Sequence, residues 1–133
     1  MYRVIVESHG GKVIYYNLNP EKNWECDLHH MEELLCNYKN IKGILVTNPS
    51  NPCGSVFSKE HLCDILGLAQ RYCLPIVSDE VYGNITFTGN TFYSLGNLAM
   101  EVGGNVPVIV ASGLAKQFLV PGWRVGWLVF YDK

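Results

Sequence analysis

The sequence has no excess of charge of one sign and no long hydrophobic run. Its 133 residues include 10 Lys and Arg against 12 Asp and Glu, which gives a formal net charge of −2. This balance offers no basic surface for nucleic acid or for an anionic membrane. No apolar stretch approaches the roughly 20 residues of a membrane-spanning helix. We therefore expect neither nucleic acid nor a membrane among the partners.

The sequence also lacks paired cysteines. Its five cysteines are odd in number and include no CxxC pair, which argues against a disulfide framework or a zinc ribbon. Three of them, Cys36, Cys63 and Cys73, fall on apolar faces of predicted helices, where we expect each thiol to pack as a small hydrophobe. This usage is typical of a reducing compartment. We expect a cytoplasmic location, with the mitochondrion as the alternative.

The composition is that of a folded domain. Hydrophobic residues make up 48% of the chain and charged residues 17%, which is typical of a globular protein. The length suits one core. We expect residues 1–133 to form a single domain.

Strand-like and helix-like segments alternate along the chain. Asp27 and Ser58 are candidate N-caps for two of the helices. Residues 1–9 suit either a strand or a helix. We expect strands at 12–18, 43–47, 74–78, 106–111 and 125–130, and helices at about 28–38, 59–73 and 95–102.

This alternation predicts an α/β fold, a mostly parallel sheet with helices on both faces. In such sheets ligands bind at the carboxyl ends of the strands. Asn51 follows one predicted strand, Asp79 ends the next, and Lys116 follows a third. The sequence therefore predicts a site at this edge of the sheet.

Lys116 is the candidate nucleophile. It ends the segment 112–116 (SGLAK), just after an apolar run. A lysine amine condenses with a cofactor aldehyde in its neutral form. Taken alone, this segment also fits an ordinary surface lysine in a glycine-containing loop.

Asp79 and Tyr82 are the next candidates. Asp79 follows the apolar run 75–77, and a carboxylate at a buried strand end is costly unless it is paired. A protonated pyridine nitrogen would be such a partner, and Tyr82 could aim its hydroxyl at the phenolic oxygen of the same ring. The alternative is that Asp79 caps the next turn and Glu80 is solvated.

Asn51 and Arg124 add an amide and a guanidinium. Asn51 lies between Pro49 and Pro52, in a rigid loop where an X-Pro bond can be cis, and its amide could donate to the phenolic oxygen. Arg124 can bind a phosphate through two parallel hydrogen bonds. The alternatives are a plain turn for Asn51 and a surface position for Arg124.

In this order, and with the strand–helix alternation, these residues resemble the large-domain core of the class I/II pyridoxal-phosphate aminotransferases, which have fold type I. The resemblance covers essentially all 133 residues. It rests on the segments 19–25 (NPEKNWE), 48–58 (NPSNPCGSVFS) and 119–124 (LVPGWR).

The resemblance implies a role for each candidate. Lys116 forms the Schiff base with pyridoxal phosphate and then shuttles a proton at the substrate Cα. Asp79 keeps the pyridine nitrogen protonated. Tyr82 and Asn51 bond the phenolic oxygen, and Arg124 binds the phosphate.

The implied reaction transfers the amino group of an aromatic (tyrosine-type) amino acid to a 2-oxo acid such as 2-oxoglutarate, within amino-acid catabolism. A homodimer is implied as well. The alternatives are a related fold type I enzyme, such as a carbon–sulfur lyase or another aromatic aminotransferase, and a catalytically dead truncated fragment.

The chain departs from the family pattern near the lysine and at both ends. Many relatives carry serine three residues before the lysine, where this chain has Gly113; Ser112, one place further back, is the remaining candidate for a phosphate contact. The family's phosphate loop and ring-stacking aromatic would precede residue 1, and its substrate-carboxylate arginine would follow Lys133. We therefore expect a partial cofactor-binding large domain, with Met1 internal to a longer chain and the 133 residues inactive alone.

A metal site is a further alternative. Five potential ligands lie at helical spacings on one predicted helix. A solvated helix face is the simpler interpretation, and we assign no metal ligand. These five residues are Asp27, His29, His30, Glu32 and Glu33.

Overall fold

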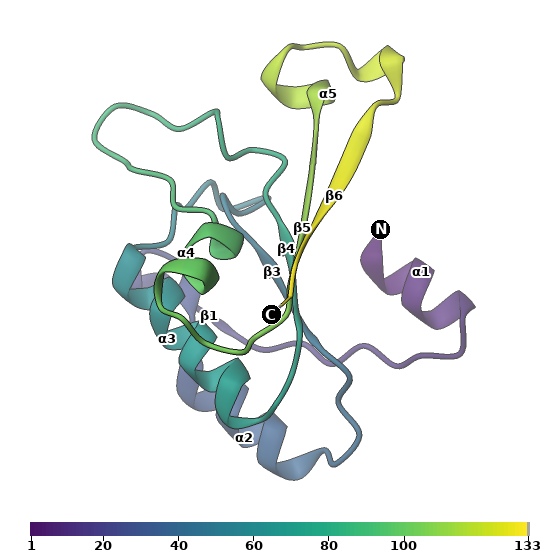
Figure 1. Ribbon diagram of the computed structural model, residues 1–133, viewed down its shortest axis with the longest axis vertical. Coiled ribbons are helices and arrows are strands. Elements are labelled where there is room, and N and C mark those ends of the chain that lie inside the picture. The colour runs from purple at the N-terminus through teal and green to yellow at the C-terminus, as the bar shows by residue number, and fades with distance from the viewer. Residues whose placement is uncertain (133) are drawn as a thin grey trace.

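The computed structural model describes residues 1–132 and is built on a four-stranded sheet (Figure 1). The first three strands are parallel, and the last runs antiparallel to its neighbour. The prediction of a mostly parallel sheet is therefore confirmed. The strand order is β3 (Ile44–Thr47), β4 (Ile76–Asp79), β5 (Val108–Gly113) and β6 (Gly126–Tyr131).

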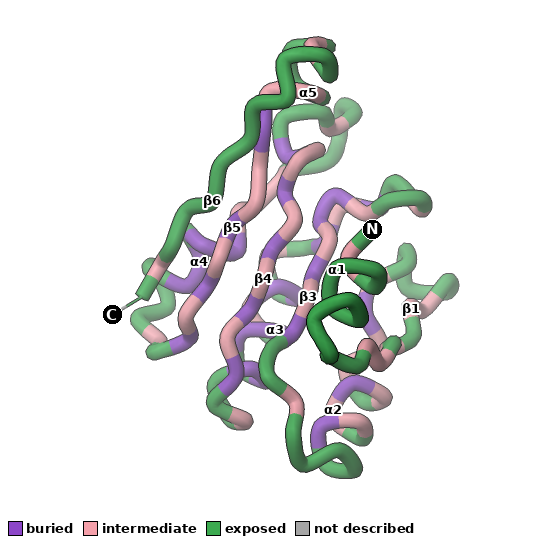
Figure 2. The backbone as a smooth tube through the Cα atoms, turned by 90° about the vertical axis from the view of Figure 1, so that its right-hand side faces the viewer, coloured by how far each residue is buried: buried purple, intermediate pink, exposed green. Residues whose placement is uncertain are grey.

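Helices lie on both faces of this sheet, as predicted. One face carries α2 (Leu28–Asn37), α3 (Lys59–Arg71) and α4 (Leu95–Glu101) (Figure 1). The other face carries α1 (Tyr2–Ser8), which lies in front of β3 in Figure 2. Within residues 1–132, no helix combines the length and apolar character needed to cross a membrane.

The predicted N-caps begin their helices. The Asp27 carboxylate accepts a hydrogen bond from the His30 N–H at 3.1 Å, and the Ser58 hydroxyl accepts one from the His61 N–H at 3.2 Å. Each cap satisfies a backbone donor that has no partner within its helix. Both helices therefore start where the sequence predicts.

The core lies between the sheet and the three helices on one face. Every second residue of β3 and β4 is buried, which is the period of a strand with one packed face (Figure 2). The largest apolar side chains with essentially no exposure are Phe57, Leu62, Ile65, Ile76, Leu95, Leu98, Val46 and Val108.

The strand predicted at 12–18 is wrong over most of its length. Only Leu18–Asn19 (β1) forms a strand, pairing antiparallel with Glu25–Cys26 (β2) on either side of a short turn, η1 (Pro20–Lys22). The aromatic residues of this segment contribute through side chains instead: the Tyr16 hydroxyl donates to the Leu45 carbonyl at 2.8 Å. Residues rich in strand propensity need a partner strand, and this segment finds none over 12–17.

Two predicted strands continue further than expected. β4 runs to Asp79 and β5 to Gly113, because their ladders continue to the pairs Asp79↔Ala111 and Gly113↔Gly126. The ambiguous N-terminal segment is the helix α1. The strand ends therefore reach the candidate site residues themselves.

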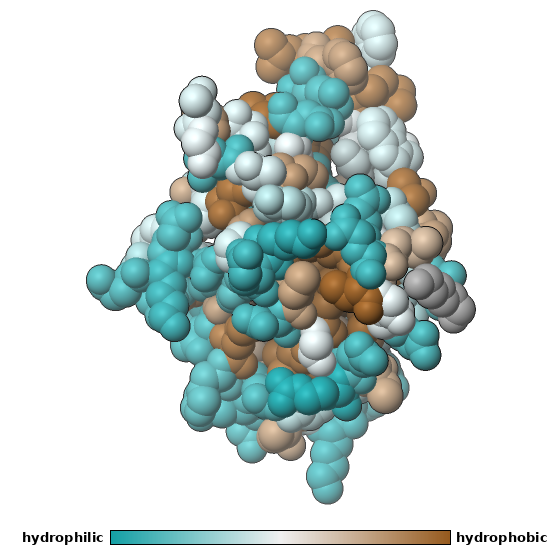
Figure 3. All heavy atoms as spheres, turned by 60° about the vertical axis from the view of Figure 1, so that its left-hand side comes forward, coloured by the Kyte–Doolittle hydropathy of each residue, from teal (hydrophilic) through white to brown (hydrophobic). Residues whose placement is uncertain are grey.

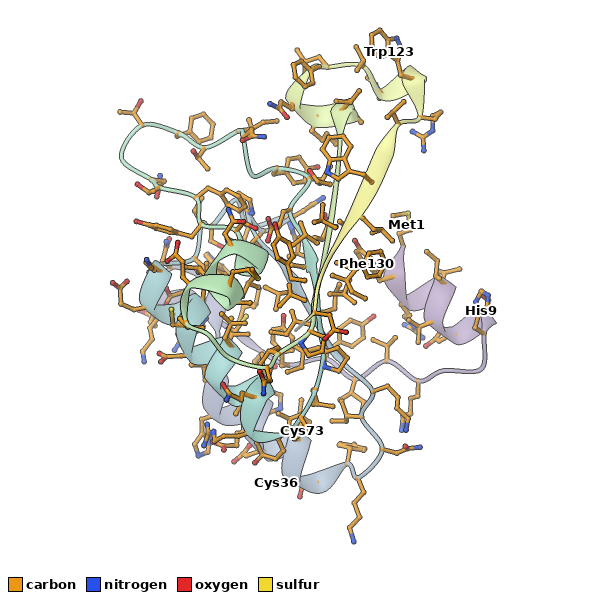
Figure 4. The ribbon with its side chains drawn as sticks, in the orientation of Figure 1. Met1, His9, Cys36, Cys73, Trp123 and Phe130 are labelled. Atoms are coloured by element: carbon orange, nitrogen blue, oxygen red, sulfur yellow. The ribbon has the colours of Figure 1, made fainter. Side chains whose placement is uncertain are left out.

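The cysteine prediction is partly wrong. Cys36 and Cys73 are exposed and Cys63 is half-buried, whereas Cys26 is buried and burial raises the pKa of its thiol to about 11. Cys36 and Cys73 lie at the end of the molecule opposite Trp123 (Figure 4). Cys36 lies in the last turn of α2 and Cys73 lies just after the end of α3, and neither is among the buried residues of the core.

The segment between β5 and β6 projects beyond the sheet (Figure 1). It contains α5 (Leu114–Gln117) and the turn η2 (Pro121–Trp123). Its apolar side chains gather at the top of the space-filling view in Figure 3. Phe118, Leu119 and Trp123 are all largely exposed there.

Glu80 is a buried carboxyl that anchors α4, so the alternative of a solvated Glu80 is wrong. Its Oε1 accepts hydrogen bonds from the Ser78 hydroxyl at 2.8 Å and from the Leu95 N–H at 2.9 Å. The residue is only 7% exposed, and burial raises the pKa of its carboxyl. Glu80 thus supplies the acceptor that Ser94, the N-cap residue of α4, does not provide.

Replacing Glu80 should destabilise the fold. In Glu80→Ala the Ser78 hydroxyl and the Leu95 N–H lose their acceptor, and we expect a loss of about 1–3 kcal/mol in the free energy of unfolding, measured with urea. The exposed Glu60→Ala is the control. A loss no larger than that of the control would contradict this role.

The same carboxyl predicts a pH dependence. Because the folded pKa of Glu80 is raised above 4.5, its contribution is full below that pH and declines as the pH rises through the folded pKa. Glu80→Gln should remove this decline from the urea-unfolding profile, since the amide does not titrate. An unchanged profile would show that Glu80 is not its source.

Candidate active site

Asp79 lies at the carboxyl end of β4, as predicted. Its backbone pairs with Thr47 on one side and Ala111 on the other. Its carboxylate accepts the Tyr2 hydroxyl through Oδ2 at 2.7 Å and the Val81 N–H through Oδ1 at 3.3 Å. The bond from Val81 shows that Asp79 does cap the following turn, while its other oxygen is held by a distant residue.

The asparagine–proline loop starts against Asp79. The Asn48 N–H donates to the Asp79 carbonyl at 3.0 Å, and the buried Asn48 side chain accepts the Phe57 N–H at 2.9 Å. The bonds Asn48-Pro49 and Asn51-Pro52 are both cis. The loop is therefore closed at its base, and Asn51 lies exposed in the turn at 51–53.

Lys116 and Tyr82 are brought together. Lys116 lies in α5, a short helix rather than a loop, which begins directly after β5. Its Nζ lies 5.5 Å from the centre of the Tyr82 ring, within the range of a cation–π contact. The Asn84 amide also donates to Gln117 at 3.0 Å, which joins the two segments a second time.

Gly113 allows β5 to approach the start of β6 closely. A Cβ on Gly113 would lie 2.9 Å from the Val125 carbonyl oxygen and 3.2 Å from the Gly126 Cα. A side chain at this position would therefore push the two strands apart. This packing explains why the chain has glycine three residues before Lys116, and it leaves the half-buried Ser112 as the hydroxyl at the end of β5.

Arg124 is exposed and bonded to its own turn. Its backbone is left-handed, with φ of 53°, and its Nη1 donates to the Pro121 carbonyl at 3.1 Å. In the described part of the chain, the structure records no bond from this guanidinium to Lys116, Asp79 or Tyr82. The phosphate-binding roles of Arg124 and Ser112 stay predictions, as does the role of Asn51.

Tyr2 is a site residue that the sequence did not indicate. Its partner, Asp79, lies 77 positions away, and no local pattern links the two. Burial raises the pKa of the Tyr2 hydroxyl, and the hydrogen bond and charge of Asp79 raise it further. The helix α1 is short and has no buried residue. Its sequence therefore did not predict that Tyr2 would lie against the sheet.

The cluster considered for a metal is used by the fold. Asp27 caps α2, and the His30 Nδ1 accepts the Asn17 N–H at 3.0 Å. Glu32 pairs with Arg71 at 2.9 Å, and His29 lies 3.5 Å from Glu33. Over residues 1–132 the structure gathers no group of three ligands suited to a metal ion.

One open cavity lies away from these groups. An open cavity of about 320 Å³ is lined by residues from 56–60 and 89–93, among them Phe57 and Tyr93. None of the predicted site residues lines it. The candidate site is instead an open edge of the sheet.

Known proteins resemble this chain in sequence and in fold. The family model of aminotransferase class I and II matches residues 1–133. The chain belongs to this family. Class I and II aminotransferases depend on pyridoxal phosphate. The roles of Lys116, Asp79 and Tyr82 toward this cofactor stay predictions.

Individual aminotransferases and one lyase give the extent of the similarity. The chain is 48% identical to tyrosine aminotransferase of Bos taurus, over 100% of this chain and 28% of that protein. It is 38% identical to an S-alkyl-thiohydroximate lyase of Arabidopsis thaliana, over 92% and 25%. The crystal structure of tyrosine aminotransferase from Leishmania infantum superposes with a TM-score of 0.90 at 37% identity, over 98% of this chain and 31% of that chain.

These matches confirm the fold type I aminotransferase architecture and the resemblance to tyrosine aminotransferases. The chain spans about 28% of the length of the tyrosine aminotransferases that it matches. The individual site residues rest on the geometry described above.

A side chain at position 113 should destabilise the pairing of β5 with β6 beside the site. Gly113→Ala forces β5 and β6 apart, and we expect a loss of about 1–3 kcal/mol in the free energy of unfolding, measured with urea. Gly67→Ala is the matched control, because Gly67 lies on the exposed face of α3 with open space at its Cβ. This control should stabilise the helix by about 0.5–1 kcal/mol. Equal effects of the two substitutions would contradict the close approach.

Proposed function

We propose that the protein to which this sequence belongs is a pyridoxal-phosphate-dependent aminotransferase. It would move the amino group of an aromatic amino acid to a 2-oxo acid such as 2-oxoglutarate. The observation that carries the proposal is the Lys116 amine, which lies 5.5 Å from the Tyr82 ring centre, in the helix that follows β5. β5 is the strand paired with β4, which ends at Asp79. Membership of the family and the similarity to tyrosine aminotransferases support it.

The residues present fit the cofactor. A primary amine, a carboxylate and a phenol at one edge of a sheet match its aldehyde, its pyridine nitrogen and its phenolic oxygen. Lys116 would attach the aldehyde, the Asp79 carboxylate would accept a hydrogen bond from the protonated ring nitrogen, and Tyr82 would bond the phenolic oxygen. Asn51 would add a second bond to that oxygen, with Arg124 and Ser112 at the phosphate.

The chemistry of transfer needs a base at the substrate Cα. When bound, the cofactor supplies an electron sink for the charge left at that carbon. The Lys116 Nζ would take up the proton from Cα and return it at the other end of the transfer. The Asp79 carboxylate would hold a proton on the ring nitrogen, while the Tyr82 ring would restrict where the amine can lie.

A carbon–sulfur lyase is the second candidate function. The 38% identity to a protein named as an S-alkyl-thiohydroximate lyase favours it. A catalytically dead fragment remains the third interpretation. The two activities differ in product, since transamination of tyrosine yields glutamate from 2-oxoglutarate and a lyase does not.

We also propose a homodimer in the cytoplasm. Phe118, Leu119 and Trp123 form apolar surface on the projecting segment, which a second copy would cover (Figures 3 and 4). The five free cysteines are consistent with a reducing compartment. That the 133 residues alone lack turnover is likewise a prediction.

The test is attachment of the cofactor to Lys116. Protein mixed with pyridoxal phosphate should develop an absorbance band near the visible edge, and borohydride reduction should fix the cofactor on the peptide containing Lys116. Lys116→Ala should lose both signals, because the attaching amine is gone. Lys39→Ala, at an exposed position after α2, should keep both. A band that survives in Lys116→Ala would place the cofactor elsewhere.

A further inference from the structure

Tyr2 makes a short hydrogen bond to the proposed cofactor aspartate. Its hydroxyl donates to the Asp79 Oδ2 at 2.7 Å, in a half-buried position. Within residues 1–132 this is the one side-chain hydrogen bond that joins α1 to another element, since the others, from Arg3, Ser8 and His9, stay within the helix and its end.

The other residues of α1 pack little against the sheet. Tyr2 is the only residue of this helix that is not exposed, and Val4, Ile5 and Val6 are 70%, 50% and 39% exposed. Packing alone therefore does not explain why the first turn lies against the end of β4. The bond to Asp79 does.

The hydrogen bond from Tyr2 restricts the terminal side-chain torsion of Asp79, which would otherwise vary broadly. The terminal torsion of an aspartate is broad, so a carboxylate held by one donor can still rotate. Here Oδ1 accepts the Val81 N–H and Oδ2 accepts the Tyr2 hydroxyl, from two separate segments. Each oxygen keeps a further lone pair for another donor.

The same bond leaves the charge of Asp79 available. Tyr2 is a neutral donor, and burial, together with the bond and charge of Asp79, raises the pKa of its hydroxyl above the usual 10.0, so it stays protonated at neutral pH. None of the ion pairs in the described part of the chain involves Asp79. The carboxylate is therefore oriented without being neutralised.

We propose that Tyr2 is a positioning residue for Asp79, holding its carboxylate in the orientation that receives a cationic ring nitrogen. The proposal rests on the proposed function, in which that nitrogen belongs to pyridoxal phosphate. Tyr2 touches no reacting atom itself and acts through Asp79.

The first test needs no cofactor. In protein labelled with ¹³C at the tyrosine ring, Tyr2→Phe identifies the Tyr2 resonance, which should titrate above the usual pKa of 10.0. Asp79→Asn keeps an acceptor of the same shape but removes the charge, and should move the Tyr2 titration back toward its usual range. A Tyr2 resonance that already titrates in the usual range in the unsubstituted protein would overturn the contact.

The second test measures the effect on cofactor binding. We expect Tyr2→Phe to raise the dissociation constant for pyridoxal phosphate about 10-fold. This is the typical effect of losing a hydrogen bond to a charged group. It should also shift the pH dependence of the bound cofactor's absorbance, which a purely structural role would leave unchanged. Tyr15→Phe, which removes a hydroxyl from an exposed ring, should change neither.

A double substitution completes the test. If Tyr2 acts through Asp79, Tyr2→Phe should add little to the loss already caused by Asp79→Asn. Tight binding with an unshifted pH profile in Tyr2→Phe would overturn the positioning role and leave the proposed function standing. Absence of binding by the unsubstituted protein would overturn both, whatever the tyrosine titration shows.

Discussion

The parallel pairing of β4 with β5 is the constraint on which the site depends. It places Asp79 beside Ala111, so the last rung of this ladder lies just before Ser112 and Gly113. The Glu80 N–H continues the ladder by donating to the Ala111 carbonyl at 2.9 Å, and the Asn48 N–H donates to the Asp79 carbonyl from the other side. Backbone bonds therefore hold Asp79 from both neighbouring strands, and the lysine helix starts a short distance along β5.

Two adjacent carboxyl groups at this edge have opposite surroundings. Glu80 turns toward the face that carries α2, α3 and α4, where it is buried and accepts the Leu95 N–H at the start of α4. Asp79 turns toward α1, where it is half-buried and bonded to Tyr2. The alternation of side chains along a strand separates the two roles, so that one carboxyl stabilises the fold while its neighbour stays accessible to a ligand.

Local patterns in the sequence predicted the parts of the fold that local forces determine. The caps Asp27 and Ser58 and the apolar strands alternating with helices were readable because capping and periodicity act over a few residues. The order of groups along the strand ends also predicted a site at one edge of the sheet, with Asn51, Asp79 and Lys116 each at or after a strand end. The bond from Tyr2 to Asp79 was not readable, because its partner is set by the approach of distant segments. The failed strand at 12–17 has the same origin, since strand propensity does not supply a partner. The environments of Asn51 and Arg124 likewise depend on contacts that spacing does not specify.

The pairing of Gly113 with Gly126 limits which residues this sequence can carry at the two positions. The two residues face each other on the last rung between β5 and β6, and added Cβ atoms would meet backbone on the opposite strand in both directions. The residue types at positions 113 and 126 therefore constrain each other and cannot vary independently. A homologue with a side chain at either place would need a compensating change across the ladder, such as a bulge or an altered strand length, to keep the lysine at the same distance from the end of β4.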